Sequence, residues 1–120
     1  MAKRIQNLSE VIGGYDVVLS DVWGVVHNGV AAFQHSCQAL AAARKAGATV
    51  VLITNSPRPY PGVKVQIRGL GVTDDAYDRI VTSGDVTRHL IAEGPKKVFL
   101  LGRERDMPLF DGLDVEVVSA

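Results

Sequence analysis

A carboxylate and a hydroxyl stand at two points of this sequence where ligands are commonly bound. Asp21 follows the apolar run 17–19, and Thr54 and Asn55 follow a second apolar run, 48–53. Short, unbroken apolar runs are typical of strands buried on both faces of a parallel sheet. Open α/β sheets bind ligands at the carboxyl ends of such strands. We therefore expect Asp21 and Thr54 to lie side by side at one edge of a sheet.

The residues after this carboxylate predict a small flap above it. Gly24 lets the backbone turn close to a bound ligand. Asn28-Gly29 between apolar residues is a strong hairpin signal, because both central residues of that turn need positive φ. Trp23 alone is more typical of a core side chain than of a ligand contact, and His27 is interpreted as a turn or surface residue.

The remaining patterns alternate between helix and strand, which predicts an α/β fold. Helices are expected around 33–48, 63–70 and 84–91, with a helical turn at 5–14, a short helix at 103–110, and further strands at 79–82, 97–101 and 114–118. Ser83 is the expected N-cap of the third helix. The strand–helix–strand order of 17–53 makes a right-handed βαβ unit with adjacent parallel strands. We expect a Rossmann-like, mainly parallel sheet between helices, a three-layer sandwich without an internal linker.

Composition narrows the class of partner and the compartment. The 120 residues are enough for one domain, and 13 basic residues balance 13 acidic ones, so nucleic acid and anionic membranes are not expected partners. Cys37 is the single cysteine, which fits a reducing compartment. No apolar run reaches the roughly 18 residues of a membrane span, and polar residues follow Met1 in place of a signal-peptide core. We expect a cytoplasmic protein.

Three short motifs follow one another along the chain. They are Asp-Val-Trp-Gly-Val at 21–25 with a following Asn-Gly, Leu-Ile-Thr-Asn-Ser at 52–56, and Thr-Ser-Gly-Asp at 82–85. Together they resemble the class IIA branch of the haloacid dehalogenase (HAD) phosphatase superfamily, which includes sugar-phosphate and nucleotide phosphatases related to the N-acetylglucosamine operon phosphatase. The similarity runs through nearly the whole chain.

The resemblance implies a magnesium-dependent hydrolase of a small phosphorylated metabolite, either a sugar phosphate or a nucleotide. Asp21 would attack phosphorus and form an aspartyl-phosphate. Mg²⁺, held by the Asp21 carboxylate and the backbone carbonyl of Trp23, would neutralise the charge between the two anions. The Thr54 hydroxyl and neighbouring backbone N–H groups, including that of Asn55, would hold the phosphoryl oxygens.

Trp23 departs from the family pattern, which has a second aspartate at that position as general acid and base. An indole cannot transfer protons at neutral pH, and loss of a positioned acid costs about 10²–10⁴ in rate. Either another group such as His27 substitutes, or turnover is slow, or the chain is a non-catalytic phosphate- or metabolite-binding module. A receiver-type phosphoacceptor fits less well, because receivers place an acidic pair at the first strand.

The family pattern also continues beyond this chain, into a cap domain and then the phosphate-anchoring lysine and the last metal-binding carboxylates. The resemblance therefore implies that residues 1–120 are the amino-terminal half of a HAD core, inactive alone. The strand at 17–21 would then have a free edge, through which two copies could associate. Asp74, Asp75 and Asp78 are interpreted as a solvated acidic loop.

Overall fold

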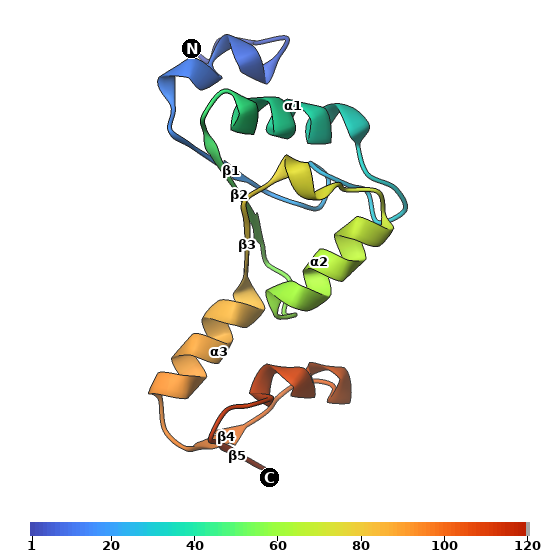
Figure 1. Ribbon diagram of the computed structural model, residues 1–120. Helices are drawn as coiled ribbons and strands as arrows, with labels where there is room; N and C mark the ends of the chain where they lie inside the picture. Colours follow the sequence, from blue (N-terminus) through green and yellow to red (C-terminus); the bar gives the residue numbers. More distant parts are fainter. Residues whose placement is uncertain (120) are drawn as a thin grey trace.

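The computed structural model describes residues 1–119, which form three α-helices and two parallel sheets (Figure 1). The strands are β1 (Val17–Ser20), β2 (Thr49–Thr54), β3 (Arg79–Thr82), β4 (Lys97–Phe99) and β5 (Glu116–Val118). The α-helices are α1 (Gln34–Lys45), α2 (Tyr60–Gly69) and α3 (Ser83–Glu93). Short 3₁₀ helices are η1 (Leu8–Glu10), η2 (Ile12–Gly14), η3 (Asp74–Ala76) and η4 (Glu104–Phe110). The predicted Rossmann-like α/β class is confirmed.

The larger sheet has the order β1-β2-β3, with all three strands parallel. Val18 lies opposite Val50, and Leu52 lies opposite Ile80. The predicted βαβ unit of β1, α1 and β2 is therefore present. Within residues 1–119, β1 pairs with β2 alone, so its other edge is free, as the predicted strand order requires.

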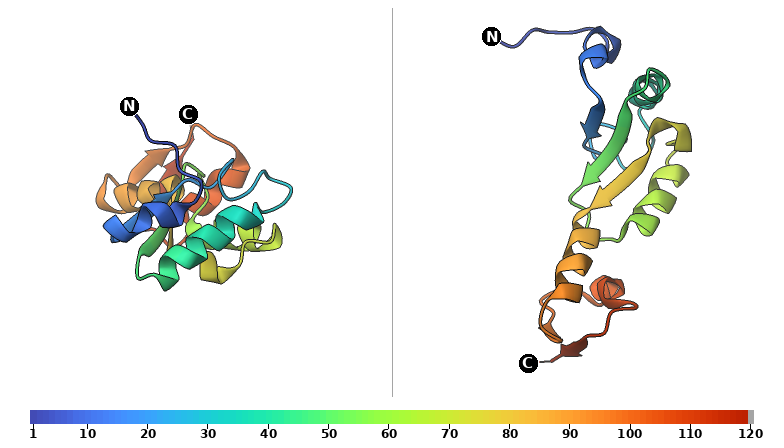
Figure 2. Two further views of the ribbon diagram at one scale, coloured as in Figure 1. Left: turned by 90° about the horizontal axis from the view of Figure 1, so that it is seen from above. Right: turned by 60° about the vertical axis from the view of Figure 1, so that its left-hand side comes forward.

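The core lies between this sheet and the helices α1 and α2, which cover the same side of it (Figure 2, right). The sheet contributes Val50 and Leu52, both fully buried. The helices contribute mainly Cys37, Leu40, Ala43, Val63 and Ile67. Burial raises the pKa of the Cys37 thiol, and this cysteine is the small buried hydrophobe that its alanine-rich surroundings suggest.

The opposite face of the sheet is exposed, so the prediction that β1 is buried on both faces is wrong. Leu19 is 65% exposed, and Val17, Ile53 and Val81 on the same face are also exposed. An apolar run indicates that a strand can be buried, but burial of both faces also requires a layer of helices on each side of the sheet. Residues 1–119 contain two layers of the sandwich, the sheet and the α1–α2 layer.

The five strands do not form one sheet but two. β4 pairs with β5 in a separate two-stranded sheet, and β4 is mostly exposed instead of buried. Thr82 is both the last residue of β3 and the N-cap of α3, one residue before the predicted cap, so α3 leads the chain directly away from the first sheet.

The resulting shape is elongated, with extents of 53 × 29 × 28 Å and a radius of gyration of 17.3 Å. A compact domain of this length has a radius of gyration of about 14 Å. Figures 1 and 2 show α3 as the connection between the two sheets. In residues 1–119, no helix combines the length and apolar character needed to cross a membrane.

Candidate active site

A hollow of about 520 Å³ lies at the carboxyl ends of β1 and β2. Its lining consists of Leu19, Ser20, Asp21, Trp23, Ile53 and Asn55. Asp21 is the first residue after β1 and Asn55 the first after β2, so the parallel pairing of the strands places both at one edge. The structure thus brings together three of the predicted site residues: Asp21, Trp23 and Asn55.

The backbone around Asp21 is fixed while its carboxylate stays accessible. The Ser20 hydroxyl donates to the Asp21 carbonyl at 2.9 Å, and the next residue, Val22, is buried. The Asp21 side chain is exposed, and Oδ1 accepts a hydrogen bond from the Val22 N–H at 2.8 Å. That is the one hydrogen bond the carboxylate makes within residues 1–119. Oδ2 is therefore available to an electrophile or a cation.

The Thr54 side chain does not enter this hollow. Side chains alternate along β2, so Thr54 points to the helix-covered face with Leu52, whereas Ile53 points to the open face. Thr54 Oγ1 accepts from the Ser56 N–H at 3.2 Å. In this structure its role is to shape the loop that carries Asn55.

The start of α3 holds that loop in place. The Gly84 N–H donates to the Ser56 carbonyl at 3.0 Å, and Asp85 Oδ2 accepts from the Tyr60 N–H at 3.0 Å. A Cβ at Gly84 would overlap the Pro57 carbonyl oxygen. The loop from Asn55 to Pro59 is therefore closed against α3 at both of its ends, and only glycine fits at the contact.

The sequence predicts a helix that begins at Gly84, but it did not predict this contact with the loop after β2. The available signal was the spacing Thr-x-x-Asp, which is a capping arrangement. Thr82 Oγ1 accepts from the Asp85 N–H at 2.9 Å, and the two side chains are also hydrogen-bonded at 3.0 Å. The Asp85 carboxylate, which accepts from the capping Thr82 hydroxyl, thus also reaches the neighbouring loop.

The flap above the hollow is a turn built on the Asn28 side chain and flanked by an antiparallel bridge between His27 and Ala32, so the flap is present but the predicted turn with positive φ at both Asn28 and Gly29 is wrong. Gly29 has φ +85° and Gly24 has φ +77°, but Asn28 keeps a negative φ. Asn28 Oδ1 accepts from the N–H groups of Val30 and Ala31, both at 2.9 Å. An asparagine side chain can replace a backbone turn in this way, which removes the need for two positive φ angles.

Trp23 lies on the flap with 59% of its surface exposed, so it is not a core residue. Its ring covers Gly29, where a Cβ would overlap the indole. The His27 ring meets it edge-on, with ring centroids 5.0 Å apart and an interplanar angle of 66°. The indole is therefore held by Gly29 at the outer edge of its six-membered ring and by the His27 ring, while Trp23 also belongs to the lining of the hollow.

His27 supports the flap and is not part of the lining of the hollow. The side chain is almost fully buried, and Nδ1 accepts from the Gly29 N–H at 2.9 Å. Burial lowers the pKa of His27, which favours the neutral ring required by that hydrogen bond. This geometry gives no support to the hypothesis that His27 replaces the missing acid.

The donor atoms at Asp21 and Trp23 fit part of a magnesium site. A carboxylate and a backbone carbonyl are oxygen ligands of the kind Mg²⁺ prefers, and Mg²⁺ commonly takes one or two carboxylates with waters and substrate phosphate. Residues 1–119 contain no group of three His, Cys, Asp or Glu side chains arranged to hold a metal ion. The fit therefore rests on Asp21, the Trp23 carbonyl and the oxygens of a bound phosphate.

Comparison with known proteins identifies the class to which this site belongs. The sequence profile of the haloacid dehalogenase-like hydrolase family matches residues 18–116. The chain belongs to this family.

A crystal structure of a haloacid dehalogenase-like hydrolase from Brucella suis 1330 is similar, with 53% sequence identity and a TM-score of 0.89. The similarity covers 97% of this chain and 43% of that one. This chain thus spans less than half the length of that relative. Among curated proteins, no match was found.

Proposed function

We propose that the chain carries the phosphoryl-accepting site of a magnesium-dependent phosphomonoester hydrolase of the HAD class IIA type. The observation that supports this most is the accessible Asp21 carboxylate at the carboxyl end of β1, in a hollow shared with Asn55. The substrate is a small phosphorylated metabolite. A cytoplasmic location belongs to the proposal and is supported by the single, buried cysteine.

In the proposed reaction, Asp21 Oδ2 attacks phosphorus and the bond between phosphorus and the ester oxygen breaks. The products are an aspartyl-phosphate and the departing alkoxide, and water then attacks phosphorus to release phosphate and regenerate the carboxylate. Mg²⁺ held by Asp21 and the Trp23 carbonyl would reduce the repulsion between the carboxylate and the phosphate dianion. The backbone of the loop at Asn55 binds the phosphoryl oxygens.

Because Trp23 cannot protonate the departing oxygen, the rate should depend steeply on the leaving group. An alcohol of low pKa leaves without a proton, whereas a sugar hydroxyl needs one from water. We expect p-nitrophenyl phosphate to be hydrolysed faster than an alkyl phosphate, by about 10²–10⁴-fold. This ratio is measured by release of phosphate at equal enzyme and Mg²⁺ concentrations.

The test of the nucleophile is Asp21→Asn with p-nitrophenyl phosphate and Mg²⁺. Its rate should fall to the uncatalysed background, because an amide is a poor nucleophile and a weaker metal ligand. Asp16→Asn is the matched control, since Asp16 is exposed just before the other end of β1. Turnover by Asp21→Asn at the parent rate would show that the nucleophile is wrongly assigned.

Trp23 also favours a second candidate, a non-catalytic module that binds phosphate or a phosphorylated metabolite. Such a module needs the loop after β2 and does not need an acid. It is distinguished by calorimetry with inorganic phosphate together with the turnover assay. Binding that depends on the loop, with no turnover of any ester, would favour the module over the hydrolase.

A further inference from the structure

The exposed face of Trp23 is not used by the chemistry proposed above, which needs only the backbone carbonyl of this residue. Trp23 has 59% of its surface exposed, so a large part of this residue is accessible to a ligand. Here the ring is also held in one orientation by Gly29 at its outer edge and by the His27 ring, which it meets edge-to-face. An aromatic surface that is both exposed and fixed has the properties of a preorganised binding surface.

The hollow beside Trp23 divides into a polar part and an apolar part. Asp21, Asn55 and Ser20 are the polar residues of its lining, while Leu19, Ile53 and Trp23 are the apolar ones. A ligand that fits this division carries a charged group joined to a flat apolar group. The two residues between which such a ligand would lie, Asp21 and Trp23, are separated by a single position of the chain.

We propose that Trp23 is a stacking surface for an aromatic ring in the alcohol part of the phosphomonoester. The preferred ligands are then aryl phosphates or nucleoside monophosphates, in contrast to simple sugar phosphates. That the ligand carries a phosphate rests on the proposed function, whereas that it carries an aromatic ring rests on the geometry of Trp23. Stacking of one base on an aromatic side chain changes affinity by about 5- to 150-fold.

Trp23 can report on its own ligand, because it is the only tryptophan in the chain. The probes are inorganic phosphate, ribose 5-phosphate, adenosine 5′-monophosphate, phenyl phosphate and adenosine, each titrated against tryptophan emission with Mg²⁺ present. We expect the two aromatic phosphates to quench the emission and to bind at least about 5-fold more tightly than ribose 5-phosphate. In phenyl phosphate the ring is joined directly to the phosphate, whereas in adenosine 5′-monophosphate a ribose separates them. Comparison of these two probes therefore shows which distance between ring and phosphate the site prefers.

The matched variants are Trp23→Leu, which keeps an apolar side chain without a ring, and Trp23→Phe, which keeps a smaller ring. Affinities of both are measured by calorimetry, as the ratio between adenosine 5′-monophosphate and ribose 5-phosphate. That ratio should fall to about one in Trp23→Leu and stay above one in Trp23→Phe. Because each variant is compared with itself across ligands, a general loss of phosphate affinity does not affect the ratio.

The outcomes separate the ring inference from the proposed function. Equal affinities for the aromatic phosphates and ribose 5-phosphate in the parent chain would overturn stacking and leave the phosphate site intact. Quenching by adenosine with no binding of phosphate or ribose 5-phosphate would support stacking and contradict the proposed function. Blue-shifted emission of the free chain, unchanged by every probe, would show that protein covers the indole and would overturn stacking.

Discussion

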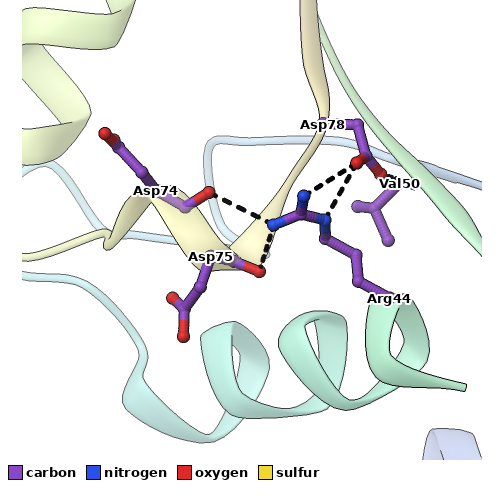
Figure 3. A network of polar contacts seen from close by, with 5 residues as sticks. All are labelled: Arg44, Val50, Asp74, Asp75 and Asp78. Carbon is purple, nitrogen blue, oxygen red and sulfur yellow. Dashed lines mark hydrogen bonds and ion pairs between the residues drawn. The ribbon is translucent and has the colours of Figure 1, made fainter.

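Two aspartates of this molecule occupy opposite kinds of environment. Asp78 lies between α1 and the larger sheet, where it forms an ion pair with Arg44 Nη2 at 2.8 Å and accepts from Arg44 Nε at 3.0 Å and from the Val50 N–H at 2.7 Å (Figure 3). Asp21 accepts one hydrogen bond, from the N–H of the residue that follows it. Both carboxylates adjoin the same sheet, yet one is occupied by protein donors and the other is open.

The difference indicates which carboxylate is structural and which is available for chemistry. The Val50 N–H and then Arg44 hold the pKa of Asp78 below its usual range, since both stabilise the charged form. Arg44 also donates to the carbonyls of Asp74 and Asp75, as Figure 3 shows. These three aspartates are exposed, as the sequence predicted, but they are not only a solvated loop, because their contacts with Arg44 tie α1 to the segment that leads into β3.

After removal of the nucleophile itself, the substitution with the largest expected effect on the rate of hydrolysis is Trp23→Asp. It places a second carboxylate two residues after Asp21, where an acid can protonate the leaving oxygen. Hydrolysis of an alkyl phosphate should rise at least about tenfold, while p-nitrophenyl phosphate gains less because it needs no proton. The two esters are compared by phosphate release. No gain for the alkyl ester, with the fold intact by circular dichroism, would mean that the missing acid is not what limits the rate.

The open side of the sheet also predicts self-association. The free edge of β1 presents unpaired backbone groups beside the exposed Leu19, a surface that can pair with a second copy. Leu19→Lys should weaken association by about tenfold or more, because a charge at an edge strand opposes strand pairing. Val65→Lys, which changes an exposed apolar residue of α2, is the control. Light scattering across a concentration series that finds only monomers of the parent chain would contradict this prediction.

A smaller effect is expected from a substitution at the contact that shapes the site around Asp21. Gly84→Ala places a Cβ against the Pro57 carbonyl, so the loop that carries Asn55 must move. We expect a loss of about 1–3 kcal/mol in the free energy of unfolding and weaker phosphate binding. Gly69→Ala is the matched control, because the space around Gly69 in α2 is open. Parent-like stability and phosphate affinity in Gly84→Ala would show that the loop is not held at this point.

The smallest expected effect concerns Asp78, the carboxylate that is occupied by protein donors, and this effect depends on pH. The folded-state pKa of Asp78 is lowered, so its contribution to stability is present above the unfolded pKa of about 3.9 and is lost as the pH falls through the folded value. Asp78→Asn should lower the melting temperature at neutral pH, and the difference from the parent chain should shrink below about pH 4. The exposed Asp111→Asn serves as the control. A difference that is constant from neutral to acidic pH would contradict the assigned role of the Asp78 charge.

The positions of the strand ends could be predicted from sequence, because apolar runs that stop at Asp21 and Thr54 are local signals. The partnership of Arg44 with Asp78 could not, since these residues are 34 positions apart and no local pattern joins them. The exposed face of β1 was missed because hydrophobicity does not reveal what covers a strand. The turn at Asn28 was mispredicted because its side chain competes with the backbone for the turn hydrogen bonds.

The central claim is that the open carboxylate of Asp21 accepts a phosphoryl group. It is tested most directly by incubating the chain with Mg²⁺ and either acetyl phosphate or p-nitrophenyl phosphate, quenching in acid, and mapping phosphorylated peptides by mass spectrometry. Our account predicts one phosphorylated site, Asp21, which is absent from Asp21→Asn and present in Asp78→Asn. A phosphoryl group on any other residue, or none on Asp21 while the ester is hydrolysed, would contradict it.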